Sequence, residues 1–195
     1  MPYVDLAFRL NGTTIPVDHG YALYAALSRL APEMHDARGL GIQPIRGVYG
    51  GDGKLHLNTS SRLVLRLPDE QIRTYLKVAG KKLEVDGHVL RVGVSDIWAL
   101  RTSTALYSRL VTIKGFVEPD SFLAAASRQL QEIGGTADLH LRERRTLRIK
   151  DKQVVGFEMV VCKLTPQDSL KLQEVGLGGR RRFGCGVFVP YGGER

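Results

Sequence analysis

YVDLAFRL (residues 3–10) alternates apolar and polar side chains as a β-strand does, and HGYALYAALSRL (residues 19–30) repeats its apolar residues with the period of an α-helix. The helical stripe follows the N-cap candidate Asp18 and consists of Tyr21, Leu23, Leu27 and Leu30. The chain therefore opens with a strand followed by a helix.

The segments that follow predict the rest of one βαββαβ unit. Two extended segments lie near residues 42–49 and 54–67 and are joined by a glycine-rich turn. Pro68-Asp69 opens a helix at about residues 69–78, and an extended stretch over residues 89–100 closes the unit.

The second half repeats this order of elements. A strand is predicted at residues 105–114, a helix at Pro119–Ile133 and a hairpin over residues 138–163 that turns at Asp151-Lys152. A helix at residues 166–175 and a strand after a glycine-rich loop complete the pattern.

Two consecutive βαββαβ units predict an α+β protein with tandem ferredoxin-like domains. Each domain is expected to have a four-stranded antiparallel sheet covered on one face by two helices. We expect domains at residues 1–100 and 101–195, the first carrying the helix at residues 19–30 with the loop that follows it and the second carrying the glycine-rich loop.

Composition narrows the class of partner. The 195 residues carry a formal net charge of +8, which indicates an acidic partner, most simply nucleic acid. No apolar run is long enough to span a bilayer and the first residues lack the features of a signal peptide, so we expect a cytoplasmic protein without membrane association. Cys162 and Cys185 lie in apolar runs and are expected to be reduced and buried.

The segment GLGGRRRFGCGVF (residues 176–188) places glycines around three consecutive arginines. Glycine lets a backbone approach a phosphate chain, successive N–H groups can form an anion-binding nest, and guanidinium groups match phosphate oxygens. The segment lacks the Gly-Lys-Ser/Thr ending of a nucleotide-binding loop. A solvated glycine turn is the alternative. The predicted RNA-binding residues here are Gly176, Gly178, Gly179, Arg180, Arg181, Arg182, Gly184 and Gly186.

A second basic cluster lies in the predicted hairpin of the second half. Arg142, Arg144 and Arg145 are candidate RNA-binding residues, and strand alternation predicts related faces for Arg142, Arg144 and Arg148. A solvated basic hairpin is the alternative. Aromatic residues make up only 7% of the chain, which favours recognition of folded RNA by charge and shape over a long stacking track.

The glycine-arginine segment, in a double ferredoxin-like chain, resembles the repeat-processing endoribonucleases of CRISPR systems. IPVDHGYALYAALSRLAPEMHDARGLGIQPIRG (residues 15–47) resembles the first helix and following loop of that family. The resemblance implies that Tyr24 and His35 are catalytic. The family often has a lysine a few residues beyond the histidine; this chain offers Arg38 and Arg46 instead.

The chemistry follows from the substrate. RNA cleavage without a metal uses the ribose 2′-hydroxyl as nucleophile, which yields a 5′-hydroxyl and a 2′,3′-cyclic phosphate. Histidine exchanges protons near neutrality, tyrosine orients or stabilises, and arginine neutralises charge on the phosphorane. His19, at the start of the first helix, is the second choice for the catalytic histidine.

Two other classes of enzyme fit the sequence less well. His35-Asp36 lacks the further ligands of a metal-dependent phosphohydrolase, so neither a metal nor another cofactor is expected. His56 and His140 do not form the repeated His-x-Thr/Ser motifs of a phosphoesterase; with His88 they are expected to be structural or RNA-facing.

Two functions stay open. The first is an endoribonuclease that cleaves CRISPR precursor RNA within its repeats and retains the product in an interference complex with other subunits. The alternative is a non-catalytic RNA-binding subunit of a CRISPR ribonucleoprotein complex. The partner in both is CRISPR repeat RNA, and the sequence leaves monomer and homodimer open.

Overall fold

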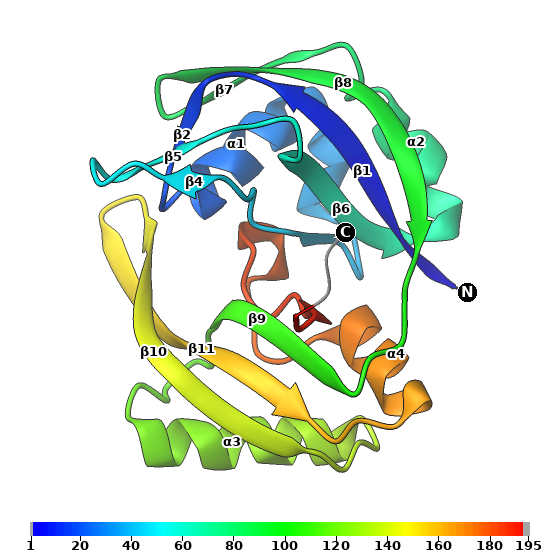
Figure 1. Cartoon of the computed structure of the whole chain (residues 1–195), viewed down its shortest axis with the longest axis vertical. Coiled ribbons are helices and arrows are strands. Elements are labelled where there is room, and N and C mark those ends of the chain that lie inside the picture. The colour runs from blue at the N-terminus through cyan, green and yellow to red at the C-terminus, as the bar shows by residue number, and fades with distance from the viewer. Residues whose placement is uncertain (1, 193–195) are drawn as a thin grey trace. The chain divides into compact units, whose positions relative to one another are not determined.

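The computed structural model describes residues 2–192. The chain divides between Ala99 and Leu100 into two compact units, and each unit has its own sheet and helices (Figure 1). Both units follow the βαββαβ order, so the prediction of a tandem ferredoxin-like fold is confirmed.

The first unit is built on an antiparallel sheet with the strand order β3-β6-β1-β8-β7. Its strands are β1 (Tyr3–Asn11), β3 (Gly41–Ile42), β6 (Arg62–Pro68), β7 (Lys82–Val85) and β8 (His88–Ala99). The four strands β3, β6, β1 and β8 form the ferredoxin-like sheet. β7 is one strand more than predicted, because residues 82–85 fold back on β8 through the turn at Asp86 and Gly87.

The helices of the first unit are α1 (Gly20–Leu30) and α2 (Ile72–Leu76), with short 3-10 turns η1 (Pro32–His35) and η2 (Asp69–Gln71). Leu23 and Leu27 of α1 and Tyr75 of α2 are buried. The N-cap of α1 is His19 and not Asp18, and its side chain does not cap the helix. The helix predicted at residues 69–78 is η2 followed by α2.

The two extended segments predicted in the first unit are each interrupted. Besides β3 and β6 they contain β4 (Val48–Tyr49) and β5 (Lys54–His56), which form a small sheet with the earlier strand β2 (Thr14–Pro16) in the order β2-β5-β4. Between β5 and β6, the side chain of Asn58 accepts a hydrogen bond from the amide of Ser60 at 2.9 Å. Such an Asx turn diverts the backbone from an extended course.

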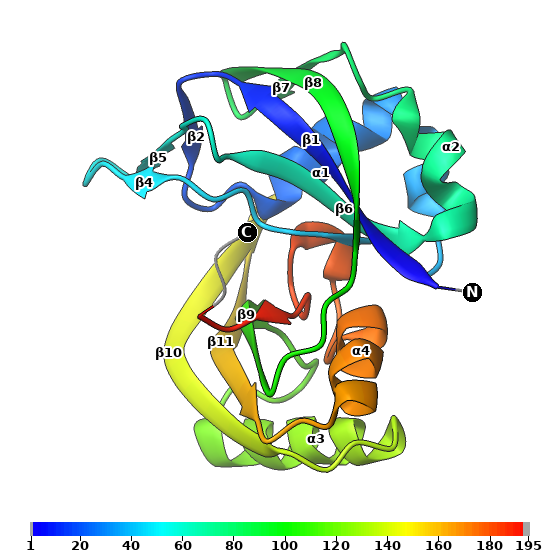
Figure 2. The same cartoon turned by 45° about the vertical axis from the view of Figure 1, so that its right-hand side comes forward.

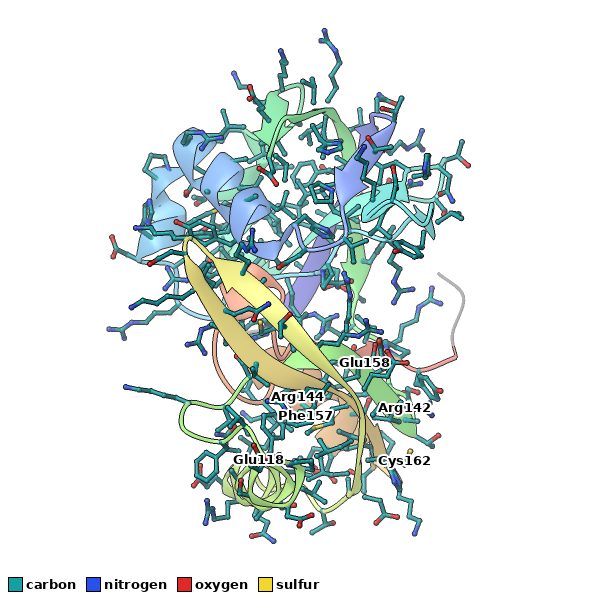
Figure 3. All side chains as sticks on the ribbon, turned by 90° about the vertical axis from the view of Figure 1, so that its left-hand side faces the viewer. Glu118, Arg142, Arg144, Phe157, Glu158 and Cys162 are labelled. Atoms are coloured by element: carbon teal, nitrogen blue, oxygen red, sulfur yellow. The ribbon has the colours of Figure 1, made fainter. Side chains whose placement is uncertain are left out.

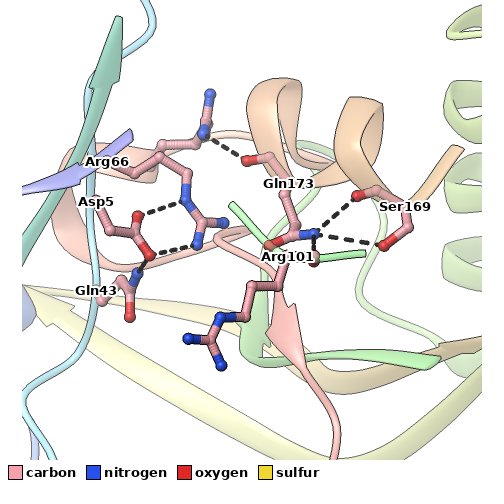
Figure 4. A network of polar contacts seen from close by, with 7 residues as sticks. Asp5, Gln43, Arg66, Arg101, Ser169 and Gln173 are labelled. Carbon is pink, nitrogen blue, oxygen red and sulfur yellow. Dashed lines mark hydrogen bonds and ion pairs between the residues drawn. The ribbon is translucent and has the colours of Figure 1, made fainter. Parts of the chain in front are cut away.

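A buried ion pair joins β1 to β6 (Figure 4). Arg66 donates from Nε to Oδ1 of Asp5 at 2.8 Å and from Nη2 to Oδ2 at 3.0 Å. Gln43 donates to the same carboxylate at 2.8 Å. Asp5 and Arg66 are directly paired in the sheet and both side chains are fully buried, so removing one partner would leave an uncompensated charge.

The second unit has an antiparallel sheet with the order β10-β11-β9-β12. Its elements are β9 (Ala105–Val111), α3 (Pro119–Glu132), β10 (Asp138–Ile149), β11 (Lys152–Cys162), α4 (Pro166–Val175), η3 (Arg181–Phe183) and β12 (Val189–Pro190). The hairpin turn lies at Lys150-Asp151, one residue earlier than predicted, with Lys150 at positive φ. Figure 2 shows the long curved β10–β11 hairpin and α3 alongside it.

One face of this second sheet packs against both helices. Phe122, Ala125, Ala126 and Leu130 of α3 and Leu172 of α4 share a core with Phe157, Met159 and Val161 of β11. The predicted apolar stripe of the α3 helix is thereby confirmed up to Leu130, and Ile133 is partly buried beside it. Within residues 100–192, no α-helix packs on the opposite face of the sheet, the helix-free face.

The segment that leads into β9 is tied to α4 (Figure 4). Gln173 donates through Nε2 to the carbonyl oxygens of Arg101 at 2.8 Å and Ser169 at 3.1 Å. The amide of Ser103 donates to Oγ of Ser169 at 3.0 Å. These bonds fix the start of the second unit on its own helix.

Candidate active site

Tyr24 and His35 meet within the first unit. α1 carries Tyr24, which is 8% exposed, and η1 carries His35, which is exposed. The Tyr24 hydroxyl lies 2.9 Å from Nδ1 of His35, and the rings meet edge-on with centroids 5.8 Å apart. A phenol can donate to or accept from Nδ1, so Tyr24 can hold both the neutral and the protonated imidazole.

The residues that precede His35 hold the 3-10 turn η1 in place. Pro32 stands at its start and Met34 is fully buried. Glu33 accepts from Lys77, with Nζ and Oε1 2.6 Å apart, and this hydrogen bond lowers the pKa of the Glu33 carboxyl below its ordinary value. Lys77 could not be predicted as the partner of Glu33 from the sequence, because the two residues lie 44 positions apart.

His19 has a different environment from His35. Its ring is 1% exposed, Nδ1 lies 2.7 Å from the carbonyl oxygen of Pro16 and Nε2 accepts from the amide of Ile45 at 3.0 Å. Both ring nitrogens thus serve backbone groups of other segments. The second-choice catalytic prediction for His19 is not supported by this geometry, which gives the residue a structural role.

Arg38 and Arg46 are both exposed in the segment that follows η1. Their backbone carbonyls accept from Gln71 Nε2 at 3.4 Å and from Ser61 Oγ at 2.7 Å, respectively. Both side chains thus lie at the surface. Among residues 2–192, neither guanidinium group is hydrogen-bonded to Tyr24 or His35.

The glycine-rich loop of the second unit is a folded turn that contains η3. The amide of Gly178 donates to Gln129 Oε1 at 2.7 Å, that of Gly179 to Thr112 O at 2.9 Å and that of Gly186 to Leu110 O at 2.7 Å. The amides of Gly176 and Gly184 also donate to carbonyls of the same unit. The expected phosphate-binding nest is therefore wrong for these five glycines, because their N–H groups are already used.

Close packing explains two of these glycines. Gly178 and Gly186 have φ of 72° and 64°, and a Cβ at either position would collide with the carbonyl oxygen of Thr112 or Leu177, respectively. Glycine is required there because an L side chain has neither the space nor the favoured dihedral angle. These two glycines are therefore explained by the packing of the loop against its own unit.

The loop covers one end of the helix-free face of the second sheet. Cys185 packs with Leu110 and Leu147, with Phe183 partly buried against them. Arg180, Arg181 and Arg182 are all partly exposed. Arg180 adopts a left-handed conformation with φ of 66° and reaches Thr112 Oγ1 at 3.4 Å, while Arg181 donates to the Gln173 carbonyl at 3.4 Å.

A β-bulge changes which hairpin arginines share a face. The register between β10 and β11 shifts between Leu141 and Arg144, so Arg144 pairs with the core residue Phe157. Arg142 and Arg145 lie on the opposite side, the side of Glu158 (Figure 3). The predicted grouping of Arg142 with Arg144 is wrong, because simple alternation does not continue through a bulge.

The residues that the structure describes also bear on the predictions about metal ligands, membrane-spanning helices and cysteines. Residues 2–192 contain no group of three or more His, Cys, Asp or Glu side chains placed to hold a metal ion. Among the same residues, no helix is long and apolar enough to cross a membrane. Cys185 is buried, and Cys162 is partly exposed at the end of β11.

The fold and these sites define a tandem ferredoxin-like protein with a tyrosine–histidine pair in its first unit and a basic glycine loop in its second. A family model described as Cas6 Crispr matches residues 4–193. A CRISPR-associated endonuclease Cas6 of Myxococcus xanthus (strain DK1622) is 40% identical over 98% of this chain and 83% of its own length. The chain belongs to the Cas6 family.

Solved structures agree in fold. The product of a Cas6-related gene from Pyrococcus furiosus has a TM-score of 0.65 at 14% identity, over 98% of this chain and 99% of that one. Thermus thermophilus Cse3, bound to an RNA that represents a pre-cleavage complex, has a TM-score of 0.56 at 16% identity, over 96% of this chain and 98% of that one.

Proposed function

We propose that this Cas6-family chain is a metal-independent endoribonuclease that cleaves CRISPR precursor RNA within its repeats. The observation that carries the proposal is the hydrogen bond between Tyr24 and an exposed His35. Two relatives support the substrate class: the 40% identical Myxococcus protein is named a CRISPR-associated endonuclease, and Thermus Cse3 binds a pre-cleavage RNA.

In the proposed reaction, the ribose 2′-hydroxyl attacks the adjacent phosphorus and the bond to the 5′-oxygen breaks. His35 transfers a proton, as base on the nucleophile or as acid on the leaving oxygen. With Nδ1 held by Tyr24, Nε2 is the nitrogen proposed to face the RNA. The products are a 5′-hydroxyl and a 2′,3′-cyclic phosphate.

The charge that builds on the phosphorane requires a cation. Arg38 and Arg46 are the candidates on the segment after His35, since both side chains are exposed. We assign binding of the RNA backbone to five arginines of the second unit: Arg180, Arg181 and Arg182 of the glycine-rich loop, and Arg142 and Arg145 of the β10–β11 hairpin. We propose that binding through several arginines also retains the product.

The test is cleavage of the repeat RNA that accompanies the gene, in the presence of a chelator. The wild-type chain is expected to cut at one site. His35→Ala is expected to bind with unchanged affinity and to cut about 10²–10⁴-fold more slowly, the usual range for loss of a general acid–base. His56→Ala, which alters another exposed histidine, is the matched control and should cut normally.

Two results would change the proposal. Normal cleavage by His35→Ala would remove His35 from the reaction. Tight binding without any cleavage by the wild-type chain would favour the alternative, an RNA-binding subunit of a CRISPR ribonucleoprotein complex.

A further inference from the structure

Two tyrosines lie together on the helix-free face of the second sheet. Tyr107 is on the central strand β9, and Tyr191 follows β12, the neighbouring edge strand. Their ring centroids are 6.0 Å apart and the rings are tilted by 33°. Tyr191 is 46% exposed and Tyr107 is partly exposed.

The pairing of the strands establishes which face this is. Tyr107 pairs with Val160 of β11, whose neighbours Met159 and Val161 point into the core formed with α3 and α4. Side chains alternate across a strand, so Tyr107 points away from the helices. Glu158 and Arg142 share that side of the sheet (Figure 3).

Polar contacts fix the Tyr107 ring in place. Its hydroxyl donates to Glu158 Oε1 at 3.0 Å, and Arg145 Nε donates to the same oxygen. Arg145 also pairs with Glu143 at 2.9 Å. Burial of the phenol, followed by the nearby Glu158 charge, raises the pKa of Tyr107 to about 12, so the hydroxyl remains a donor at neutral pH.

Arg142 indicates that the Tyr191 ring face accepts a planar group. Its guanidinium carbon lies 5.7 Å from the ring centroid, and Nη2 donates to the Tyr191 hydroxyl at 3.2 Å. Arg145 is offset by two carboxylates, whereas no ion pair of Arg142 with a carboxylate occurs among residues 2–192. Arg142 is exposed, so its long side chain can leave the ring and reach a phosphate.

We propose that Tyr191 and Tyr107 form a platform on which one or two bases of a single-stranded RNA segment stack, with Arg142 moving from the Tyr191 ring to the adjoining phosphate. This proposal rests on the proposed function, since it takes RNA to be the ligand. Four-stranded sheets of the same βαββαβ order bind bases on aromatic side chains of this face in RRM domains. The third strand, β11, places Glu158 and Val160 beside Tyr107, so the platform is limited to one or two bases.

The test compares two probes: a short oligouridylate and an abasic ribose-phosphate chain of the same length. Base–aromatic stacking accounts for about 5- to 150-fold in affinity per base, so Tyr191→Ala should weaken oligouridylate binding by that factor. Binding of the abasic chain should not change. Tyr191→Phe keeps the ring and should restore binding. Tyr49→Ala, which removes a tyrosine that is 62% exposed on β4, is the matched control and should have no effect.

Unchanged oligouridylate binding by Tyr191→Ala would overturn the platform, as would an equal loss on the abasic chain. Cleavage of repeat RNA by the wild type is measured separately. Cleavage with no Tyr191 effect overturns the platform alone, whereas a Tyr191 effect without any cleavage upholds the platform and overturns the proposed nuclease.

Discussion

At the scale of single residues, the hydrogen bond between Tyr24 and His35 has a direct kinetic consequence. Tyr24→Phe removes only the hydroxyl that lies 2.9 Å from Nδ1. A hydrogen bond to an ionised group contributes about 1.5–3 kcal/mol, so we expect the single-turnover cleavage rate to fall by about 10- to 150-fold. RNA affinity should stay at the wild-type value. An unchanged rate would mean that the phenol does not orient the imidazole.

Tyr107 provides a pH-dependent prediction. Its pKa is raised from the ordinary 10.0 to about 12, so the folded state favours the protonated phenol. This contribution to stability is complete below pH 10 and is lost as the pH rises towards about 12. The tyrosinate absorbance of the wild type minus that of Tyr107→Phe should therefore show a step near pH 12. A step near pH 10 would contradict the burial of the Tyr107 phenol and its contact with Glu158.

The histidines illustrate how far sequence can go at this scale. His19 and His35 both lie beside the first helix; the family resemblance ranks His35 first, but the sequence does not separate the environments of their rings. The structure does, because His19 bonds to two backbone groups through both nitrogens while His35 is exposed. The partners of His19 are the backbone oxygen of Pro16 and the backbone nitrogen of Ile45. Every residue has such a carbonyl oxygen and nearly every residue has such an amide, so the sequence does not reveal these contacts.

At the scale of elements, the glycine loop predicts a sharp contrast between neighbouring positions. Gly178→Ala introduces a Cβ at positive φ that collides with the Thr112 carbonyl. A left-handed conformation alone costs an L residue about 1–2 kcal/mol, so we expect the free energy of unfolding to fall by at least about 2 kcal/mol. The measurement is denaturant unfolding of the full chain.

Gly179→Ala is the control, because a Cβ there has no atom within 4 Å and the backbone is not at positive φ. Its free energy of unfolding should lie within about 0.5 kcal/mol of the wild type. Equal destabilisation by both substitutions would contradict the packing role assigned to Gly178.

Elements predicted from long periodic segments are correct, and the features that were missed depend on how neighbouring strands pair. α1, α3 and the β10–β11 hairpin follow from apolar spacing. β7 is four residues long and becomes a strand only by pairing with β8. The bulge in β10, which separates Arg142 from Arg144, depends on the register with β11, and strand alternation alone does not encode it.

At the scale of the whole molecule, the repeated βαββαβ order was sufficient to predict the tandem ferredoxin-like fold, because each unit has two amphipathic helices and a sheet that need one another. The net charge of +8 likewise predicts an acidic partner. Net charge does not specify which arginines would contact that partner.

Replacing the three arginines of the glycine-rich loop tests whether they contact the RNA. Replacing Arg180, Arg181 and Arg182 together with glutamine should weaken RNA binding and flatten its salt dependence. Each phosphate contact contributes about 0.7–0.9 to the slope of log affinity against log salt, so the slope should fall by about two to three units. A slope identical to that of the wild type would remove the loop arginines from the RNA interface.

The central claim is that the chain cuts repeat RNA by attack of the ribose 2′-hydroxyl. The most direct measurement uses a repeat RNA with a single 2′-deoxynucleotide at the cut site, in chelator. This RNA should bind normally and remain intact, while a deoxynucleotide one position downstream should leave cleavage unaffected and give 5′-hydroxyl and 2′,3′-cyclic phosphate ends. Cleavage of the substituted bond, or products with 5′-phosphate ends, would contradict the account.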